Sequence, residues 1–158
     1  MEKIIKLRKL INYYGLDGYI IPKNDEFFNE YVAPFKDRLK FISNFSGSFG
    51  FALIFKKNNY LFVDGRYTLQ AKIQSGNKFK IFTIPNQLPI KVIKMKKLKI
   101  GFDPKLHTEQ SLKYFFNKTN CDFVSINQNL VDKLMIKKKN IVKKFYILPK
   151  KAVDQDFK

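Results

Sequence analysis

Asp64 and Arg66 are the residues of this chain most suited to binding a ligand, because a carboxylate and a guanidinium directly follow an apolar run. Residues 60–63 have the composition of a buried strand, and an amphipathic stretch with Tyr67, Leu69, Ala71 and Ile73 follows them, which predicts a strand, a tight turn and a helix. Gly65 allows that turn without a steric penalty. Such a turn lies at the carboxyl end of a strand, where α/β sheets usually bind their ligands.

Arg66 is one of three arginines, with Arg8 and Arg38, in a chain with 31 lysines and arginines. A guanidinium presents a planar fork of hydrogen-bond donors that an ammonium group lacks, so an arginine kept among lysines deserves an explanation. Taken alone, the simplest explanation is an ion pair with a neighbouring carboxylate.

Other residues capable of chemistry are interpreted as structural. The one histidine, His107, precedes Thr108, a good helix N-cap, and the one cysteine, Cys121, precedes a short apolar run. Residues 46–50 (Ser-Gly-Ser-Phe-Gly) resemble a phosphate-binding loop, but they lead into a strand and lack the following Lys-Ser/Thr, so a tight turn is expected. Six phenylalanines are expected to pack in the core: Phe27, Phe28, Phe41, Phe45, Phe51 and Phe55.

The composition fits one domain, since 158 residues with 45% hydrophobic side chains are enough for a core. Residues 1–12 alternate charged and apolar positions, so neither a secretory signal nor a membrane span is expected. A single cysteine agrees with a reducing compartment. We therefore expect a cytoplasmic protein without a membrane partner.

The formal net charge of +18 raises the alternative of a small basic nucleic-acid-binding module. The excess is almost entirely lysine spread along the chain, whereas arginine, the usual reader of bases and phosphates, is scarce. A composition rich in Lys, Asn, Ile and Phe is also typical of proteins from AT-rich genomes. We expect no specific nucleic-acid partner, only weak binding that falls as salt rises.

The apolar spacing predicts alternating helices and strands. The expected elements are a helix over 4–14 ended by Gly15, a strand over 19–21, a short helix capped by Asn24 or Asp25, a hairpin of 51–55 and 60–63, a helix over 66–74, strands over 79–84 and 99–102, a helix from Thr108 to Asn117, and a strand at 123–124. A hairpin followed by alternating strands and helices implies an α/β domain, with a mixed β-sheet flanked by helices.

Six short motifs occur in a fixed order along the chain. They are YIIP at 19–22, EYVAP at 30–34, Arg38 with FISNFSGS at 41–48, DGRYTLQ at 64–70, GFDP at 101–104 and NLVD at 129–132. From about residue 7 to about residue 134, this series resembles the N-terminal domain of aminopeptidase P, the Xaa-Pro aminopeptidase of the creatinase/prolidase group. The resemblance implies a ribonuclease-H-like sheet flanked by helices.

The resemblance also implies roles for two residues. Arg66 would face the catalytic domain of an intact enzyme and help bind the substrate peptide, while Asp64 would orient the guanidinium through a charge-assisted hydrogen bond. Enzymes of this family hydrolyse peptides with proline at the second position. They use two divalent metal ions, with manganese as the expected metal, held by carboxylates and a histidine in a C-terminal domain.

No part of this chain matches that metal-binding region, so we expect it to hold no metal and to be inactive alone. Its expected partner is the catalytic domain of the same enzyme, in cis or as a separate chain. Residues 1–134 are expected to form the domain, and 135–158, which are rich in lysine, a linker and the start of a second domain.

Two departures from relatives affect the expected substrate contacts. Phe27-Phe28-Asn29 stand where His-Gln-Ser commonly precedes Glu-Tyr, and residues 85–99 form a shortened stretch. A further alternative is an orphan fragment of a degenerate pseudoenzyme, which would expose apolar surface left by missing neighbours.

Overall fold

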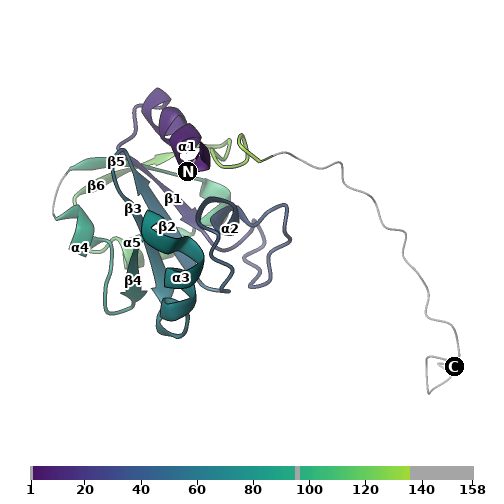
Figure 1. Cartoon of the computed structure of the whole chain (residues 1–158). Helices are drawn as coiled ribbons and strands as arrows, with labels where there is room; N and C mark the ends of the chain where they lie inside the picture. Colours follow the sequence, from purple (N-terminus) through teal and green to yellow (C-terminus); the bar gives the residue numbers. More distant parts are fainter. Residues whose placement is uncertain (1, 95–96, 136–158) are drawn as a thin grey trace, which may run out of the picture.

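A six-stranded sheet forms the centre of the domain in the computed structural model, which describes residues 2–94 and 97–135 (Figure 1). In order across the sheet, the strands are β4 (Lys80–Ile84), β3 (Asn59–Asp64), β2 (Gly50–Phe55), β1 (Gly18–Pro22), β5 (Leu98–Phe102) and β6 (Cys121–Ser125). Strand β2 is antiparallel to both β1 and β3, whereas the other neighbouring pairs are parallel. The predicted mixed α/β sheet is therefore confirmed.

Helices cover both faces of this sheet. Helices α1 (Glu2–Tyr13), α2 (Arg38–Ser43) and α3 (Thr68–Ser75) contribute to one hydrophobic cluster, and α4 (Ile90–Ile93) and the end of α5 (Glu109–Phe115) contribute to another. Successive strand residues point to opposite faces, so Ile21 belongs to the first cluster and Ile20 to the second. Burial on both faces explains why the central strands are continuously apolar.

Most of the predicted elements appear where the apolar pattern placed them. The hairpin pairs Phe51 with Phe62, whose rings stack with centroids 4.8 Å apart. Helix α1 is followed by Gly15 with φ +63°, and α5 begins after Thr108, which forms a capping box with Ser111. Helices α2 and α4 were not predicted, because each has only one or two turns and too few residues for an apolar period.

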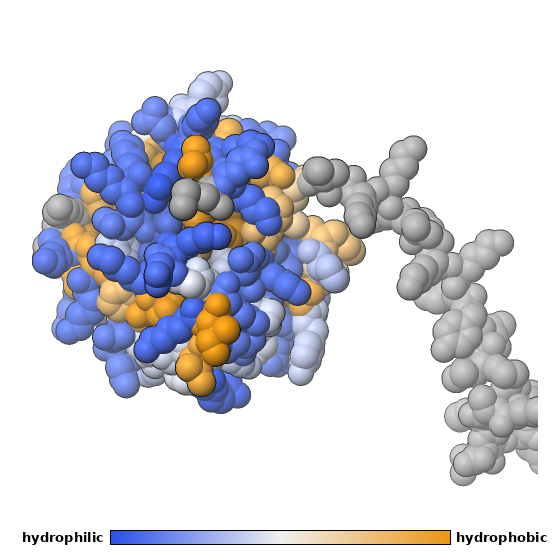
Figure 2. All heavy atoms as spheres, viewed as in Figure 1, coloured by the Kyte–Doolittle hydropathy of each residue, from blue (hydrophilic) through white to orange (hydrophobic). Residues whose placement is uncertain are grey.

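The apolar side chains of α3 are arranged differently from the prediction. Leu69 and Ile73, four residues apart, share the outer face and are 70% and 75% exposed, while Ala71 and Ser75 are buried. The amphipathic pattern predicted after Arg66 was therefore wrong, since residues two apart lie on opposite sides of a helix. Figure 2 shows separate apolar patches among hydrophilic side chains on the side of the molecule that α1 and α3 cover.

The segment after β1 is a turn and not the predicted short helix. The Asp25 carboxylate accepts hydrogen bonds from the backbone amides of Phe27 (3.0 Å) and Asn29 (3.2 Å), and so closes a tight turn where a helix was expected. Phe27 and Phe28 are 75% and 52% exposed, which corrects the prediction that they pack in the core. The other four phenylalanines of that prediction are buried or half-buried.

Within the described residues, none of the helices combines the length and the apolar character needed to cross a bilayer. The predicted linker and second-domain start at 135–158 lie outside the described residues, apart from Met135.

Candidate functional site

A cavity of about 550 Å³ lies at one end of the central strands. Pro22 ends β1, Asp64 ends β3, and Gly50 begins the antiparallel β2, so three adjacent strands bring these residues to the same end of the sheet. Arg66 also lines this cavity. A larger hollow of about 1090 Å³ surrounds α5, but it is a broad opening along one exposed helix in which Lys113 pairs with Glu109. The first cavity is therefore the candidate site.

Asp64 holds the guanidinium of Arg66 in place. One Asp64 oxygen, Oδ1, accepts hydrogen bonds from the Arg66 backbone amide and from its Nε, both at 2.9 Å. This hydrogen bonding lowers the pKa of the Asp64 carboxyl, so the group stays ionised. The Arg66 side chain is 73% exposed, and its two terminal nitrogens have no acceptor within the described part of the chain. They can therefore donate to a ligand.

The turn that presents Arg66 is anchored on either side of it. Asp64 caps a 3₁₀ turn over Gly65–Tyr67, and the Tyr67 ring packs edge-on against the buried Phe45. The Tyr67 hydroxyl lies 2.9 Å from the Ser48 hydroxyl, which ties the turn to the loop before β2. With Tyr67 held against the core, Arg66 faces outward.

Residues 46–50 form a loop with bends at Ser48 and Phe49 in place of the predicted tight turn, but the close backbone packing predicted with it is present. A Cβ at Gly47 would lie 2.3 Å from the Phe45 ring, and a Cβ at Gly50, with φ +156°, would lie 2.6 Å from the Phe62 carbonyl oxygen. Glycine is therefore required at both positions by close packing, and phosphate binding need not be invoked.

Three phenylalanines form an apolar wall of the cavity, which sequence reasoning missed. Phe28 and Phe49 are 52% and 48% exposed, and Phe115 of α5 is half-buried. Phe28 has the left-handed φ of 58°, which is uncommon for a bulky residue. Its positive φ has no signal in the sequence, so only the fold could locate this side chain.

His107 lines the same cavity directly before the Thr108 cap. Its ring packs edge-on against Phe102, and its Nε2 atom is buried without a hydrogen-bond partner among the described residues. Burial disfavours the charged imidazolium and lowers the pKa of His107 to about 4. The sequence prediction that His107 is structural stays a prediction.

The depressed pKa of His107 predicts a loss of stability on acidification. In the unfolded chain a histidine takes up its proton near pH 6.5, whereas folded His107 resists until about pH 4. The contribution of neutral His107 to the free energy of unfolding should therefore be fully present above pH 6.5 and be lost as the pH drops towards 4. The expected loss is about 1–2 kcal/mol between pH 8 and pH 5. Urea unfolding of wild type and His107→Gln at both pH values measures the difference, and parallel pH curves would contradict it.

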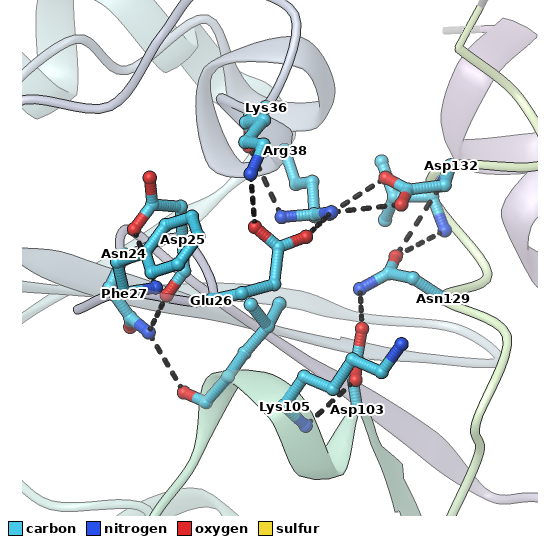
Figure 3. Close-up of polar contacts among 12 residues, drawn as sticks. Asn24, Asp25, Glu26, Phe27, Lys36, Arg38, Asp103, Lys105, Asn129 and Asp132 are labelled. Carbon is cyan, nitrogen blue, oxygen red and sulfur yellow. Dashed lines mark hydrogen bonds and ion pairs between the residues drawn. The ribbon is translucent and has the colours of Figure 1, made fainter. Parts of the chain in front are cut away.

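A second group of charged residues surrounds Arg38 (Figure 3). The buried Arg38 side chain donates through Nε and Nη2 to both oxygens of Asp132, at 2.7 and 2.9 Å, and through Nη2 to Glu26 at 2.8 Å. Lys36 also donates to Glu26. Burial opposes ionisation of Glu26, but the hydrogen bonds from Lys36 and Arg38 outweigh it and lower the Glu26 pKa to about 2.

The same network holds the last described segment against the sheet. Asn129 donates to Asp103 at 2.9 Å and accepts from the Val131 backbone amide, as Figure 3 shows beside the Arg38 pair. Leu130 and Val131 are fully buried in the first hydrophobic cluster. All three nitrogens of the Arg38 guanidinium donate to protein acceptors, so the Arg38 cluster is interpreted as structural and the Arg66 cavity as the ligand site.

Across residues 2–94 and 97–135, no three His, Cys, Asp or Glu side chains come close enough to hold a metal ion. Cys121 is half-buried, and burial raises the pKa of its thiol above the usual value. This thiol is therefore a poor nucleophile near neutral pH, as expected for a packing role.

Comparisons with known proteins agree with the fold and with the family that the motifs resemble. The model of the creatinase/prolidase N-terminal domain matches residues 3–134. A probable Xaa-Pro aminopeptidase P from Aspergillus flavus is 34% identical over 141 residues, which cover 83% of this chain and 21% of that protein. The chain thus spans about a fifth of the length of such curated relatives.

Solved structures of related peptidases have the same fold over most of this chain. The X-prolyl aminopeptidase of Caenorhabditis elegans, described as a cytosolic enzyme with a di-nuclear active site, is 31% identical with a TM-score of 0.73, over 84% of this chain and 25% of that one. An N-terminal domain of the cytoplasmic peptidase PepQ from Mycobacterium tuberculosis has the same fold, at 23% identity and a TM-score of 0.61, over 84% of this chain and 98% of that one. The chain belongs to the creatinase/prolidase N-terminal domain family, and the relatives to which it is similar include Xaa-Pro aminopeptidases.

Proposed function

We propose that this domain forms part of the substrate pocket of a metal-dependent Xaa-Pro aminopeptidase and contributes Arg66 to peptide binding. The observation that carries the proposal is the geometry of Arg66. Its Nε donates to Asp64 at 2.9 Å. Its terminal nitrogens remain available as donors at a cavity at the end of the central strands. A guanidinium held in this way loses little conformational entropy when it binds a peptide oxygen.

The chemical step would occur in another domain. Two divalent metal ions, for which we propose manganese, would activate water there for attack on the peptide bond before proline. This chain supplies no metal ligands within its described residues, so its contribution is to bind and orient the peptide. The di-nuclear site of the Caenorhabditis elegans relative and its cytosolic location support this division and a cytoplasmic enzyme.

We further propose that residues 1–134 are the domain and that 135–158 lead towards the rest of the enzyme. The family match ends at residue 134, which supports the boundary. Partners would then be the catalytic domain, in cis or as a separate chain, and a peptide with proline at its second position. The relatives found are peptidases, which favours this function over a nucleic-acid module.

The 158-residue chain alone should not release the first residue from Xaa-Pro peptides, even with manganese added, because its described residues hold no cluster of metal ligands. Activity should appear when the chain is joined to, or mixed with, the metal-binding catalytic domain of an Xaa-Pro aminopeptidase. Release of the first residue, followed by liquid chromatography, measures both. Turnover by the chain alone that survives repurification, or no activity in the assembled enzyme, would contradict the proposal, and the second result would favour an orphan fragment.

A further inference from the structure

Phe28 and Phe49 expose large apolar surfaces on the cavity that contains Arg66. They are 52% and 48% exposed, and neither ring belongs to either hydrophobic cluster of the core. Half-exposed aromatic rings contribute little to the hydrophobic core, and burial against a ligand would remove their remaining apolar surface from water. The cavity therefore combines an apolar wall with the exposed guanidinium donors of Arg66.

The backbone at Phe28 is strained, and local hydrogen bonds maintain that strain. A bulky L-residue is unfavourable at φ 58°, and asparagine or glycine would fit there better. Asp25 secures the turn by accepting from the amides on both sides of Phe28, at Phe27 and Asn29. The turn thus holds an unfavourable residue in a fixed place on the cavity without any gain in the core.

The charges around the cavity are largely balanced. Asp64 and Glu30 are anionic members of its lining, and Lys23 is paired with the buried Asp37 at 2.6 Å. The Arg66 nitrogens that remain available therefore suit an uncharged peptide carbonyl better than a free anion. A peptide carbonyl with a large apolar side chain nearby would match both features of the cavity.

We propose that Phe28 and Phe49 form a subsite for a large apolar side chain of the peptide whose carbonyl oxygen binds Arg66. The inference rests on the proposed function and specifies its substrate class as Xaa-Pro peptides that carry an aromatic or large aliphatic residue. Phe28 acts here as a specificity residue, because it contacts a substrate side chain and not the atoms of the bond that is cleaved.

Amidated tripeptides test the subsite on the 158-residue chain. They lack the C-terminal carboxylate, which could otherwise pair with Arg66 and obscure the effect of the apolar side chain. Ala-Pro-Phe-amide and Phe-Pro-Ala-amide are titrated against the ¹⁵N-labelled chain, with Ala-Pro-Ala-amide as reference. At least one phenylalanine peptide should bind about fivefold more tightly than the reference, or about 1 kcal/mol. Shifts should centre on the amides of Gly50, Arg66 and Ser111, which line the cavity.

Phe28→Asn separates recognition from folding. Asparagine tolerates the left-handed conformation, so the variant should be at least as stable as the wild type, while the preference should fall below twofold. Phe27→Asn is the matched control, because Phe27 lies on the same turn and is 75% exposed but does not line the cavity. Its preference should equal that of the wild type.

The proposal is overturned if the wild-type protein binds none of the peptides at about 10 mM or binds all of them equally well. It is also overturned if Phe28→Asn keeps the preference for phenylalanine peptides. The role of Arg66 has a separate readout, which is the kinetics of an assembled enzyme. Unchanged hydrolysis by an Arg66 variant would reject the bond from the peptide carbonyl to Arg66, whereas a lost peptide preference in Phe28→Asn reports on the apolar subsite alone.

Discussion

Replacing Arg66 with alanine in the assembled enzyme is expected to lower kcat/KM for Xaa-Pro peptides by about tenfold or more and to leave the stability of the domain nearly unchanged. The kinetic loss is the size expected when charge-assisted hydrogen bonds to a substrate are removed. Stability should hardly change because Arg66 is 73% exposed, and exposed ion pairs contribute little to folding. Steady-state kinetics and urea unfolding measure the two effects.

Two further variants identify what the Arg66 side chain contributes. Arg66→Lys keeps the positive charge but loses the planar fork, so it should recover only part of the lost kcat/KM. Asp64→Asn removes the carboxylate that fixes Nε at 2.9 Å, and we expect a smaller loss than for Arg66→Ala. A large fall in the free energy of unfolding with unchanged kinetics would show that Arg66 serves only the fold.

The local parts of the site could be predicted from the sequence. Asp64 and Arg66 are two residues apart, and the apolar run before them indicates a strand end, so their contact follows from local geometry. The paired strands β2 and β3 were likewise predictable, because a short polar loop joins two apolar runs. The motif order then identified the family that the comparisons established.

Contacts between distant segments could not be predicted in this way. Arg38 and Asp132 are 94 residues apart, and nothing near either residue indicates that the segment after β6 returns to the start of α2. The exposure of Phe28 was missed for a related reason. Hydrophobic spacing indicates which side chains could share a face, but not whether another element packs on that face.

Replacing Arg38 with alanine should produce the largest loss of stability among these variants, about 3 kcal/mol in the free energy of unfolding. The buried guanidinium makes three hydrogen bonds of 2.7–2.9 Å to Asp132 and Glu26. Removing one partner of a buried ion pair leaves charges without compensation. The loss should lie at the lower end of the known range, because Asp132 and Glu26 remain about 30% exposed to water.

The effect should also be local to the last described segment. Leu130 and Val131 are fully buried, and Asp132 next to them is fixed by Arg38, so their amides should lose hydrogen-exchange protection first. Arg38→Lys should recover part of the stability, since an ammonium cannot bind both Asp132 oxygens with the same geometry. Arg66→Ala is the matched control, an arginine of the same chain whose ion pair is exposed. Equal, small losses for Arg38→Ala and Arg66→Ala would mean that hydrophobic packing of Leu130 and Val131 holds the segment without the Arg38 cluster.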